Sequence, residues 1–135
     1  MRPVRAVNSD APVLDTSVLI AILNNESYEE RVLDLLEGAV IGAVNWAEVW
    51  TKLHEFGLAE DSRLETLFGL LAPIKPFTQA QAQLAGDLRP LTRHLGLSLG
   101  DRACLALGIE AGADVYTAEH AWSHLDVGCK VHLIR

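Results

Sequence analysis

Four acidic residues stand at positions where a fold could gather them into one site: Asp15, Glu48, Asp101 and Glu119. Clustered carboxylates repel one another, and each raises the pKa of its neighbours. A hard divalent cation with oxygen ligands, Mg²⁺ or Mn²⁺, resolves that repulsion. A cation held by carboxylates and water lowers the pKa of the water and stabilises charge building on a phosphate. The four acids therefore favour metal-assisted phosphoryl chemistry.

Each acid also has a simpler interpretation when it is taken alone. Asp15 could cap the helix that follows it, and Glu48 and Asp101 each occupy the last position of a capping-box pattern. Glu119 could be an ordinary loop acid. Two observations weaken these interpretations: Asp15 directly follows an apolar run, and Asp101 precedes a helix, 103–109, that has no polar face. A carboxylate beside dry core is more typical of a site than of a cap.

The elements that must position these acids alternate along the chain. Short β-type runs are expected at 12–15, 39–42, 114–117 and 131–134, with a weak fifth run at 74–77 whose proline suggests a sheet edge. Helical patterns fill the intervals between them. Strands separated by helices form a parallel sheet covered on both faces. Ligands of such sheets lie at the carboxyl ends of the strands, where Asp15 and Glu119 are expected.

Capping patterns predict where several of the helices begin. Four are present: Ser27-x-x-Glu30, Asn45-x-x-Glu48, Ser62-x-x-Glu65 and Ser98-x-x-Asp101. Gly57 and Pro73 are expected to end the second and third of these helices. A further helix is predicted from about 79 to 95, with a kink at Pro90.

Length and composition fit a single domain over residues 1–135, with a polar lead-in at 1–11. Half of the residues are hydrophobic, which is enough for a core. The longest apolar stretch, 103–109, is far shorter than the roughly 20 residues of a membrane span. No signal peptide is visible and two cysteines make no disulfide framework, so a soluble, cytoplasmic protein is expected. The net charge of −7 argues against a general nucleic-acid coat.

Four segments occur in the order typical of one family: VLDTSVLIA at 13–21, VNWAEV at 44–49, GLSLGDRACLA at 96–106 and VYTAEHAW at 115–122. Together they resemble PIN-domain ribonucleases, and more narrowly the VapC-type toxins of prokaryotic toxin–antitoxin pairs. The resemblance covers about residues 12–135, and its third segment is the strongest. It implies an α/β fold: a three-layer α/β/α sandwich around a mostly parallel sheet of four to five strands.

The resemblance also implies a function and a set of site residues. The function is metal-dependent endonucleolytic hydrolysis of RNA with Mg²⁺ or Mn²⁺, by a toxin that forms a homodimer and binds an antitoxin. The site would consist of four acids, with Asp15, Asp101 and Glu119 as metal ligands and Glu48 beside them, supported by Ser17, Asn45 and Thr117. Glu48 or Asp101 would help to remove a proton from the attacking water. The family usually has Asp where this chain has Glu119, which leaves open a PIN-like binding module with weak or no catalysis.

Four cations are candidates to meet RNA phosphates at the rim of the site: Lys52, Arg89, Arg93 and Arg102. Ordinary solvated charges are the alternative interpretation for all of them. Two other functions fit less well. A phospho-acceptor signalling domain needs a second early acid beside Asp15 and a lysine after a late strand, and neither is present. An aspartic protease needs an all-β frame and a second Asp-Thr loop.

Overall fold

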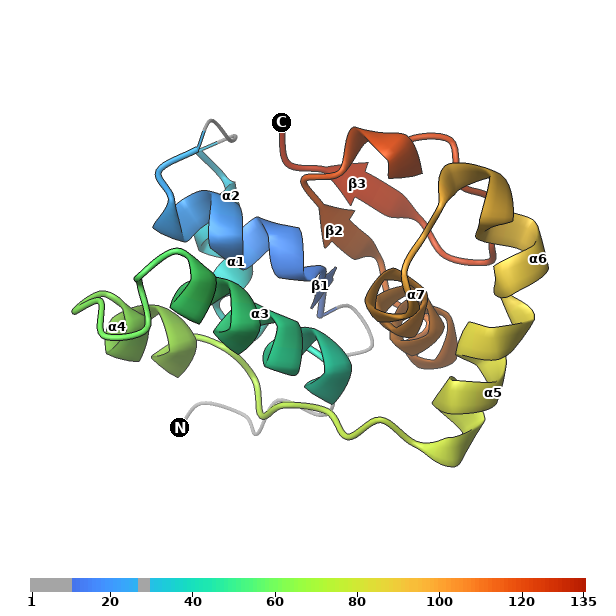
Figure 1. Ribbon diagram of the computed structural model, residues 1–135, viewed down its shortest axis with the longest axis horizontal. Coiled ribbons are helices and arrows are strands. Elements are labelled where there is room, and N and C mark those ends of the chain that lie inside the picture. The colour runs from blue at the N-terminus through green and yellow to red at the C-terminus, as the bar shows by residue number, and fades with distance from the viewer. Residues whose placement is uncertain (1–10, 27–29) are drawn as a thin grey trace, which may run out of the picture.

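The computed structural model describes residues 11–26 and 30–135 (Figure 1). Three parallel strands form its sheet in the order β1 (Val13–Leu14), β2 (Val115–Thr117) and β3 (Val131–Leu133). Two isolated parallel bridges, Val13 with Val40 and Gly42 with Lys75, extend the pairing beyond β1. The predicted parallel sheet is thus confirmed. The described residues form three strands where four to five were expected, because the runs at 39–42 and 74–77 take part only in the two bridges. In the second run, Pro76 has no N–H with which to continue the pairing.

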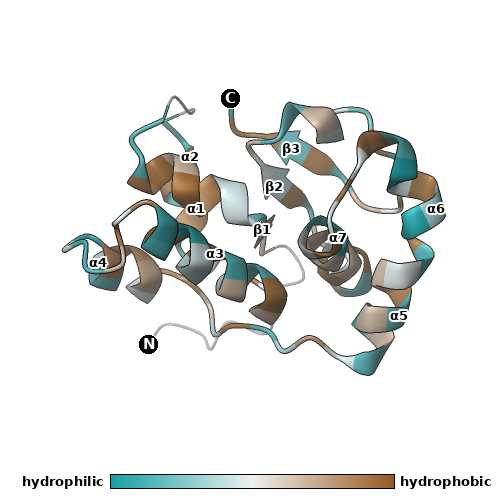
Figure 2. Cartoon of the chain, in the orientation of Figure 1, coloured by the Kyte–Doolittle hydropathy of each residue, from teal (hydrophilic) through white to brown (hydrophobic). Residues whose placement is uncertain are grey.

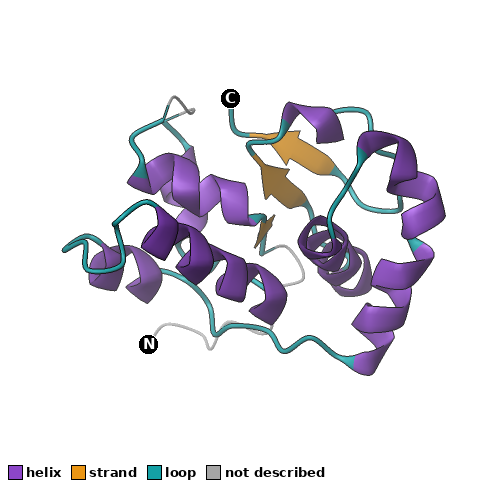
Figure 3. Cartoon of the chain, in the orientation of Figure 1, coloured by secondary structure: helices purple, strands orange, loops and turns teal. Residues whose placement is uncertain are grey.

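Helices cover both faces of the sheet (Figure 3). In chain order they are α1 (Thr16–Leu23), α2 (Val32–Leu36), α3 (Ala43–Glu55), α4 (Leu64–Gly69), α5 (Gln79–Asp87), α6 (Arg89–Thr92) and α7 (Leu99–Ala111), with 3₁₀ turns η1 (Arg93–Leu95) and η2 (His120–Trp122). The helix predicted from 79 to 95 is divided into three pieces, with a break at Leu88. Pro90 lies in the first turn of α6, where its missing N–H costs no helical hydrogen bond.

Alternate residues of the strands face opposite layers. Val13 and Val115 pack in the core with α5 and α7, whereas Leu14 packs with α1 and α3. The apolar run 103–109 forms the buried helix that the sequence predicts, and Cys104 within it is a core residue with no exposed surface. A Cβ at Gly108 would collide with Val115, so α7 packs unusually close to β2 at this point.

The hydropathy of the chain follows this packing. Figure 2 shows strong apolar colouring along α1, of which every residue but Ser17 is buried. No helix in the described part of the chain is long and apolar enough to cross a membrane. Cys104 and Cys129 are both free thiols.

Of the four predicted capping boxes, one is confirmed and two are wrong. Ser98 Oγ accepts from the Asp101 N–H at 3.1 Å, and Asp101 Oδ2 accepts from the Ser98 N–H at 2.9 Å. Asn45 caps nothing, because α3 begins two residues earlier, after Gly42. Ser62 is likewise not a cap. The fourth pattern, at 27–30, lies partly outside the described residues.

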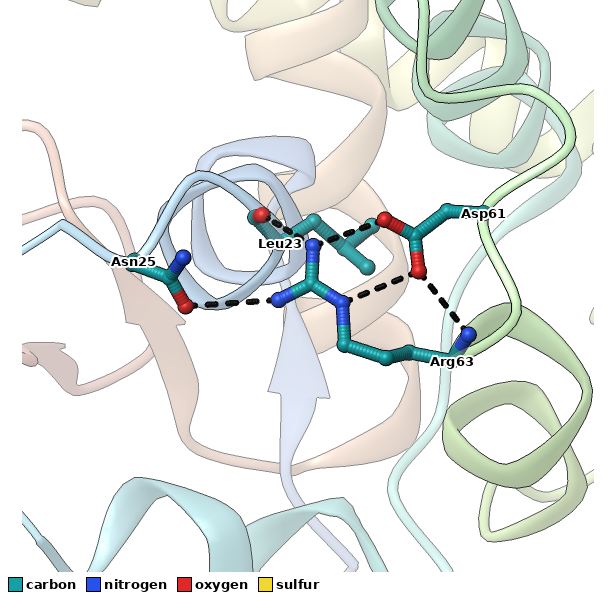
Figure 4. Close-up of polar contacts among 4 residues, drawn as sticks. All are labelled: Leu23, Asn25, Asp61 and Arg63. Atoms are coloured by element: carbon teal, nitrogen blue, oxygen red, sulfur yellow. Dashed lines mark hydrogen bonds and ion pairs between the residues drawn. The ribbon is translucent and has the colours of Figure 1, made fainter.

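A polar clasp joins the end of α1 to the start of α4 (Figure 4). The Arg63 guanidinium donates to the Leu23 carbonyl at 2.6 Å, to Asn25 Oδ1 at 3.3 Å and to both carboxylate oxygens of Asp61 at 2.9 Å. Asp61 also accepts from the Arg63 backbone N–H at 2.8 Å. The hydrogen bonds from Arg63 lower the pKa of Asp61 to about 2. The clasp fixes the segment that follows α1. In the same region α4 ends at Gly69, four residues before the predicted stop at Pro73.

Candidate acidic active site

The four predicted acids line one pocket of about 210 Å³. Asp15 and Glu119 reach it from the carboxyl ends of β1 and β2, Asp101 from the first turn of α7 and Glu48 from the second turn of α3, because α3 begins earlier than the sequence pattern indicates. Convergence at the carboxyl end of a parallel sheet follows the general rule for such folds. Ser17, Lys52 and the helix residue Thr16 also line this pocket.

Asp15 is the most buried of the four acids, with 3% of its surface exposed. It occupies the N-cap position of α1 without making a side-chain capping bond, so capping does not account for it. Its Oδ2 accepts instead from Ser17 Oγ at 2.7 Å and from Thr117 Oγ1 at 3.0 Å. Burial raises the pKa of Asp15 to about 6, the Ser17 hydrogen bond opposes the shift, and the charge of Asp101 adds to it. A buried carboxyl that ionises near neutral pH is a common feature of functional sites.

Two hydroxyls connect Asp15 to the end of β2. Ser17 Oγ accepts from the Ala118 N–H at 2.9 Å, and Thr117 Oγ1 accepts from the Glu119 N–H at 3.0 Å. The two hydroxyls lie 3.2 Å apart. Each therefore holds both the carboxylate and the chain that leaves β2, and this leaves the exposed Glu119 at the edge of the pocket.

Glu48 is held by side chains from two helices. Its Oε1 accepts from Thr16 Oγ1 at 3.1 Å and from Asn45 Nδ2 at 3.0 Å. The same Asn45 amide reaches the Gly100 carbonyl at 3.2 Å, and a Cβ at Gly100 would collide with the Glu48 carboxylate. Burial raises the pKa of Glu48, and the charge of Asp101 adds to that shift. Sequence reasoning did not identify Thr16 as a site residue. The only signal for it in the sequence is its position directly after Asp15.

Asp101 combines two roles that the sequence presents as alternatives. One oxygen of its carboxylate completes the capping box of α7 through the Ser98 N–H. The same carboxylate lines the pocket and raises the pKa of Asp15 and of Glu48. A capping acid can thus also belong to a site when its helix begins at the carboxyl edge of the sheet.

The four candidate cations lie in different places. Lys52 lines the pocket, whereas the other three do not. Arg102 donates from Nη1 to the Ala85 carbonyl at 2.8 Å, which turns it toward α5, and Arg89 reaches the Leu97 carbonyl at 3.4 Å. Arg93 lies in η1. Their contact with RNA stays a prediction.

Sequence reasoning missed one cation and one acid of the pocket. Arg135 Nη1 lies 2.9 Å from Glu26 Oε1, and both side chains line the pocket. Arg135 follows β3 by two residues. The rule that sites form at the carboxyl ends of strands could have found it, because β3 was predicted correctly.

The donor set of the pocket fits a hard cation that keeps some of its water. In the described ranges, no three His, Cys, Asp or Glu side chains are close enough together to hold a metal ion among themselves. Mg²⁺ commonly binds through one or two carboxylates, with water filling its other positions. Asp15 and Asp101, which repel each other across the pocket, offer such oxygens and gain from a positive charge between them.

Comparisons with known proteins identify the fold. A family model described as "PIN domain" matches residues 13–128. VapBC2 from Rickettsia felis, solved with a DNA fragment from its promoter, has a chain that superposes with a TM-score of 0.72 at 19% identity, covering 92% of this chain and 98% of that one. A chain of FitAcB from Neisseria gonorrhoeae gives a TM-score of 0.67 at 22% identity, over 89% and 95%. A toxin–antitoxin complex from Klebsiella pneumoniae gives 0.65 at 19%, over 91% and 96%. No curated protein matches the sequence significantly.

The family match spans most of the chain and includes all four predicted acids. The solved structures share the three-dimensional fold over nearly their whole length. The resemblance to PIN domains that the four sequence segments carry is therefore confirmed, and the chain belongs to the PIN-domain family.

Proposed function

We propose that this PIN domain is a metal-dependent endoribonuclease and the toxin of a toxin–antitoxin pair. Its substrate would be RNA in the cytoplasm. The observation that carries the proposal is the placement of Asp15, a buried carboxyl with a pKa of about 6, in one pocket with four further acids. Burial of such a carboxyl lowers the stability of the fold, so its presence favours a functional role for its charge.

Asp15 and Asp101 would hold Mg²⁺ or Mn²⁺ directly or through water, and Glu119 is close enough to the pocket to contribute. When bound, the ion would supply charge stabilisation to a phosphodiester and lower the pKa of water. Ser17 and Thr117 keep the Asp15 carboxylate in a fixed orientation. Glu48, whose pKa is raised, would take the proton of the attacking water, with Asp101 as the alternative base.

The antitoxin proposal comes from a solved relative, and the homodimer proposal from the family resemblance. The Klebsiella pneumoniae structure is by its description a toxin–antitoxin complex. We infer by analogy that this chain binds an antitoxin and forms a homodimer. Co-purification of the chain with the product of an adjacent small open reading frame would test the first inference, and sedimentation of the isolated chain the second.

The test of the activity is cleavage of a labelled RNA pool by purified protein, in Mg²⁺, in Mn²⁺ and in chelator. The variant Asp101→Asn removes a pocket charge, and Asp87→Asn makes the same change on the exposed side of α5 as a matched control. We expect metal-dependent cutting by the wild type and by Asp87→Asn, and little or none by Asp101→Asn.

Two other outcomes would contradict the proposal. Cutting that survives both chelator and Asp101→Asn indicates a contaminating nuclease. No cutting of total cellular RNA in any metal favours the binding-module alternative, and restoration of cutting by Glu119→Asp would then assign the loss to the longer side chain.

A further inference from the structure

The pocket of this PIN domain has a charged pair at its edge. Arg135 Nη1 and Glu26 Oε1 are 2.9 Å apart, and about a third of each side chain is exposed, at 35% and 37%. Arg135 follows the carboxyl end of β3, and Glu26 follows α1. The pair thus joins two segments that are distant in sequence, and both residues line the pocket that holds the acids.

The charge balance of the pocket makes this arginine notable. Five carboxylates line it, from Asp15, Glu26, Glu48, Asp101 and Glu119. Among the described residues that line it, the cations are Lys52 and Arg135. RNA is a polyanion, and its binding depends on cations that neutralise phosphates. The planar fork of a guanidinium matches two phosphate oxygens at once, which a lysine ammonium does not.

The chain at Arg135 and the chain at Glu26 are both held in position by contacts other than this ion pair. Ile134, beside Arg135, is 1% exposed, and its N–H donates to the Thr117 carbonyl at 3.0 Å. The Glu26 N–H donates to the Ala21 carbonyl at 2.8 Å, and the Arg63 clasp holds the residues just before it (Figure 4). Exposed ion pairs also contribute little to stability. The backbone therefore presents both charges at the pocket whether or not they touch.

We propose that Arg135 binds a phosphate of the RNA beside the acidic pocket, and that Glu26 holds the guanidinium there until RNA displaces it. Arg135 is then a substrate-binding residue that fixes the position of the strand. Glu26 competes with the phosphate for the same guanidinium, so it lowers RNA affinity. This inference rests on the proposed ribonuclease function.

Binding is measured with a fluorescent single-stranded RNA of about 12 nucleotides, a typical site size. The parent is the full chain carrying Asp101→Asn, in chelator, so that no cleavage occurs. Three variants are compared in it: Arg135→Gln, Glu26→Gln and Lys130→Gln. Lys130 is an exposed residue just before β3, at the opposite end of the strand from Arg135, so its variant makes the same change in net charge away from the pocket.

We expect Arg135→Gln to weaken binding several-fold and to reduce the slope of log K against log salt by about 0.7, the value for one phosphate contact on a single strand. Glu26→Gln should strengthen binding, and Lys130→Gln should change it by less than about twofold, because its charge meets no phosphate directly. In the active protein, Arg135→Gln should raise KM and leave kcat nearly unchanged. Thermal melting of each variant verifies the fold.

Opposite effects of the two pocket variants are the decisive result. If Glu26→Gln and Arg135→Gln both weaken binding, the pair is structural and the inference is wrong. If Arg135→Gln matches Lys130→Gln in affinity, slope and KM, the inference also fails, while the ribonuclease proposal stands as long as the wild type cleaves RNA. A chain that neither binds nor cleaves RNA overturns both.

Discussion

The side-chain amide of Asn45 donates to Glu48 Oε1 at 3.0 Å, across one turn of α3. The same nitrogen lies 3.3 Å from Thr16 Oγ1 and 3.2 Å from the Gly100 carbonyl. Asn45 is only 1% exposed. The two N–H groups of this amide thus donate to three acceptors, one each from α1, α3 and α7, and they fix the position of the Glu48 carboxylate.

Replacement of Asn45 by Ala should therefore impair the site more than the core. We expect RNA cleavage to fall about 10- to 100-fold, the usual effect of losing a residue that orients a site ligand. The free energy of unfolding should fall by about 1–3 kcal/mol, because buried acceptors lose their donor. Steady-state cleavage and urea denaturation measure the two effects. Thr51→Ala, at an exposed hydroxyl on the same helix, is the control and should change neither. Full activity in Asn45→Ala would contradict this role.

Gly100 offers a second test of the same contact. A Cβ there would collide with the Glu48 carboxylate, so Gly100→Ala must displace Glu48 or the start of α7. We expect a large loss of cleavage in a protein that still folds. At the exposed Gly86 of α5, a Cβ meets nothing within 4 Å, and Gly86→Ala should stabilise the protein by about 0.5–1 kcal/mol with full activity. Equal activity in the two variants would show that Glu48 tolerates displacement.

The parts of this site that the sequence predicts are those governed by local rules. Asp15 and Glu119 follow apolar runs, so strand prediction alone places them at one edge of a parallel sheet. The Ser98-x-x-Asp101 box fixes the start of α7 and hence the position of its acid.

The parts that the sequence does not predict depend on contacts between distant segments. The pattern at Asn45 resembles a cap, but the chain enters α3 two residues earlier, and the amide is used for a contact with α1 and α7 instead. Similarly, Arg102 is adjacent to Asp101 in sequence, yet its side chain packs toward α5, whereas the distant Arg135 lines the pocket. Adjacent helix residues point in different directions, so sequence proximity is a poor guide to which cation meets the substrate.

The role of Glu119 is open to a direct comparison of two substitutions. Its side chain is exposed at the pocket edge, while its backbone N–H is fixed by Thr117. If it contributes to metal binding, Glu119→Gln should raise the Mn²⁺ concentration for half-maximal cleavage by about 10-fold or more, and Glu119→Asp should keep it near the wild-type value. Titration of cleavage rate against Mn²⁺ measures this. Identical titrations for all three proteins would exclude Glu119 as a metal ligand.

Metal binding should also be visible without any RNA. Mg²⁺ or Mn²⁺ that binds the folded pocket stabilises it by mass action, by about 2.7 kcal/mol at a hundredfold excess over the dissociation constant. The melting temperature of the wild type should rise with added metal, and that of Asp15→Asn should rise much less. Asp87→Asn, outside the pocket, should respond like the wild type. An equal rise in all three proteins would place the ion elsewhere.

The raised pKa of Asp15 predicts a pH dependence of stability in the metal-free protein. The group ionises near pH 6 in the folded chain and near its ordinary value of 3.8 when unfolded. Between these values the folded state binds more protons than the unfolded state, so stability falls as pH rises from about 4 to 6. At neutral pH the free energy of unfolding is therefore lower by the full amount, about 3 kcal/mol. Glu48, whose pKa is also raised, acts in the same direction.

Asp61 changes the free energy of unfolding in the opposite direction, and it does so at lower pH. Its pKa is lowered to about 2, so its stabilising contribution is present above about pH 4 and is lost as the pH falls toward 2.

Asp15→Asn should flatten the decline in stability between pH 4 and 6. It should also make the metal-free protein more stable than the wild type at pH 7.5, since an amide oxygen can still accept from Ser17 and Thr117. Urea denaturation in chelator, at pH values from about 2 to 7.5, measures the Asp61 and the Asp15 effects on the free energy of unfolding. A less stable Asp15→Asn at pH 7.5 would show that the carboxylate supports the fold, and that its burial is not a cost accepted for metal binding.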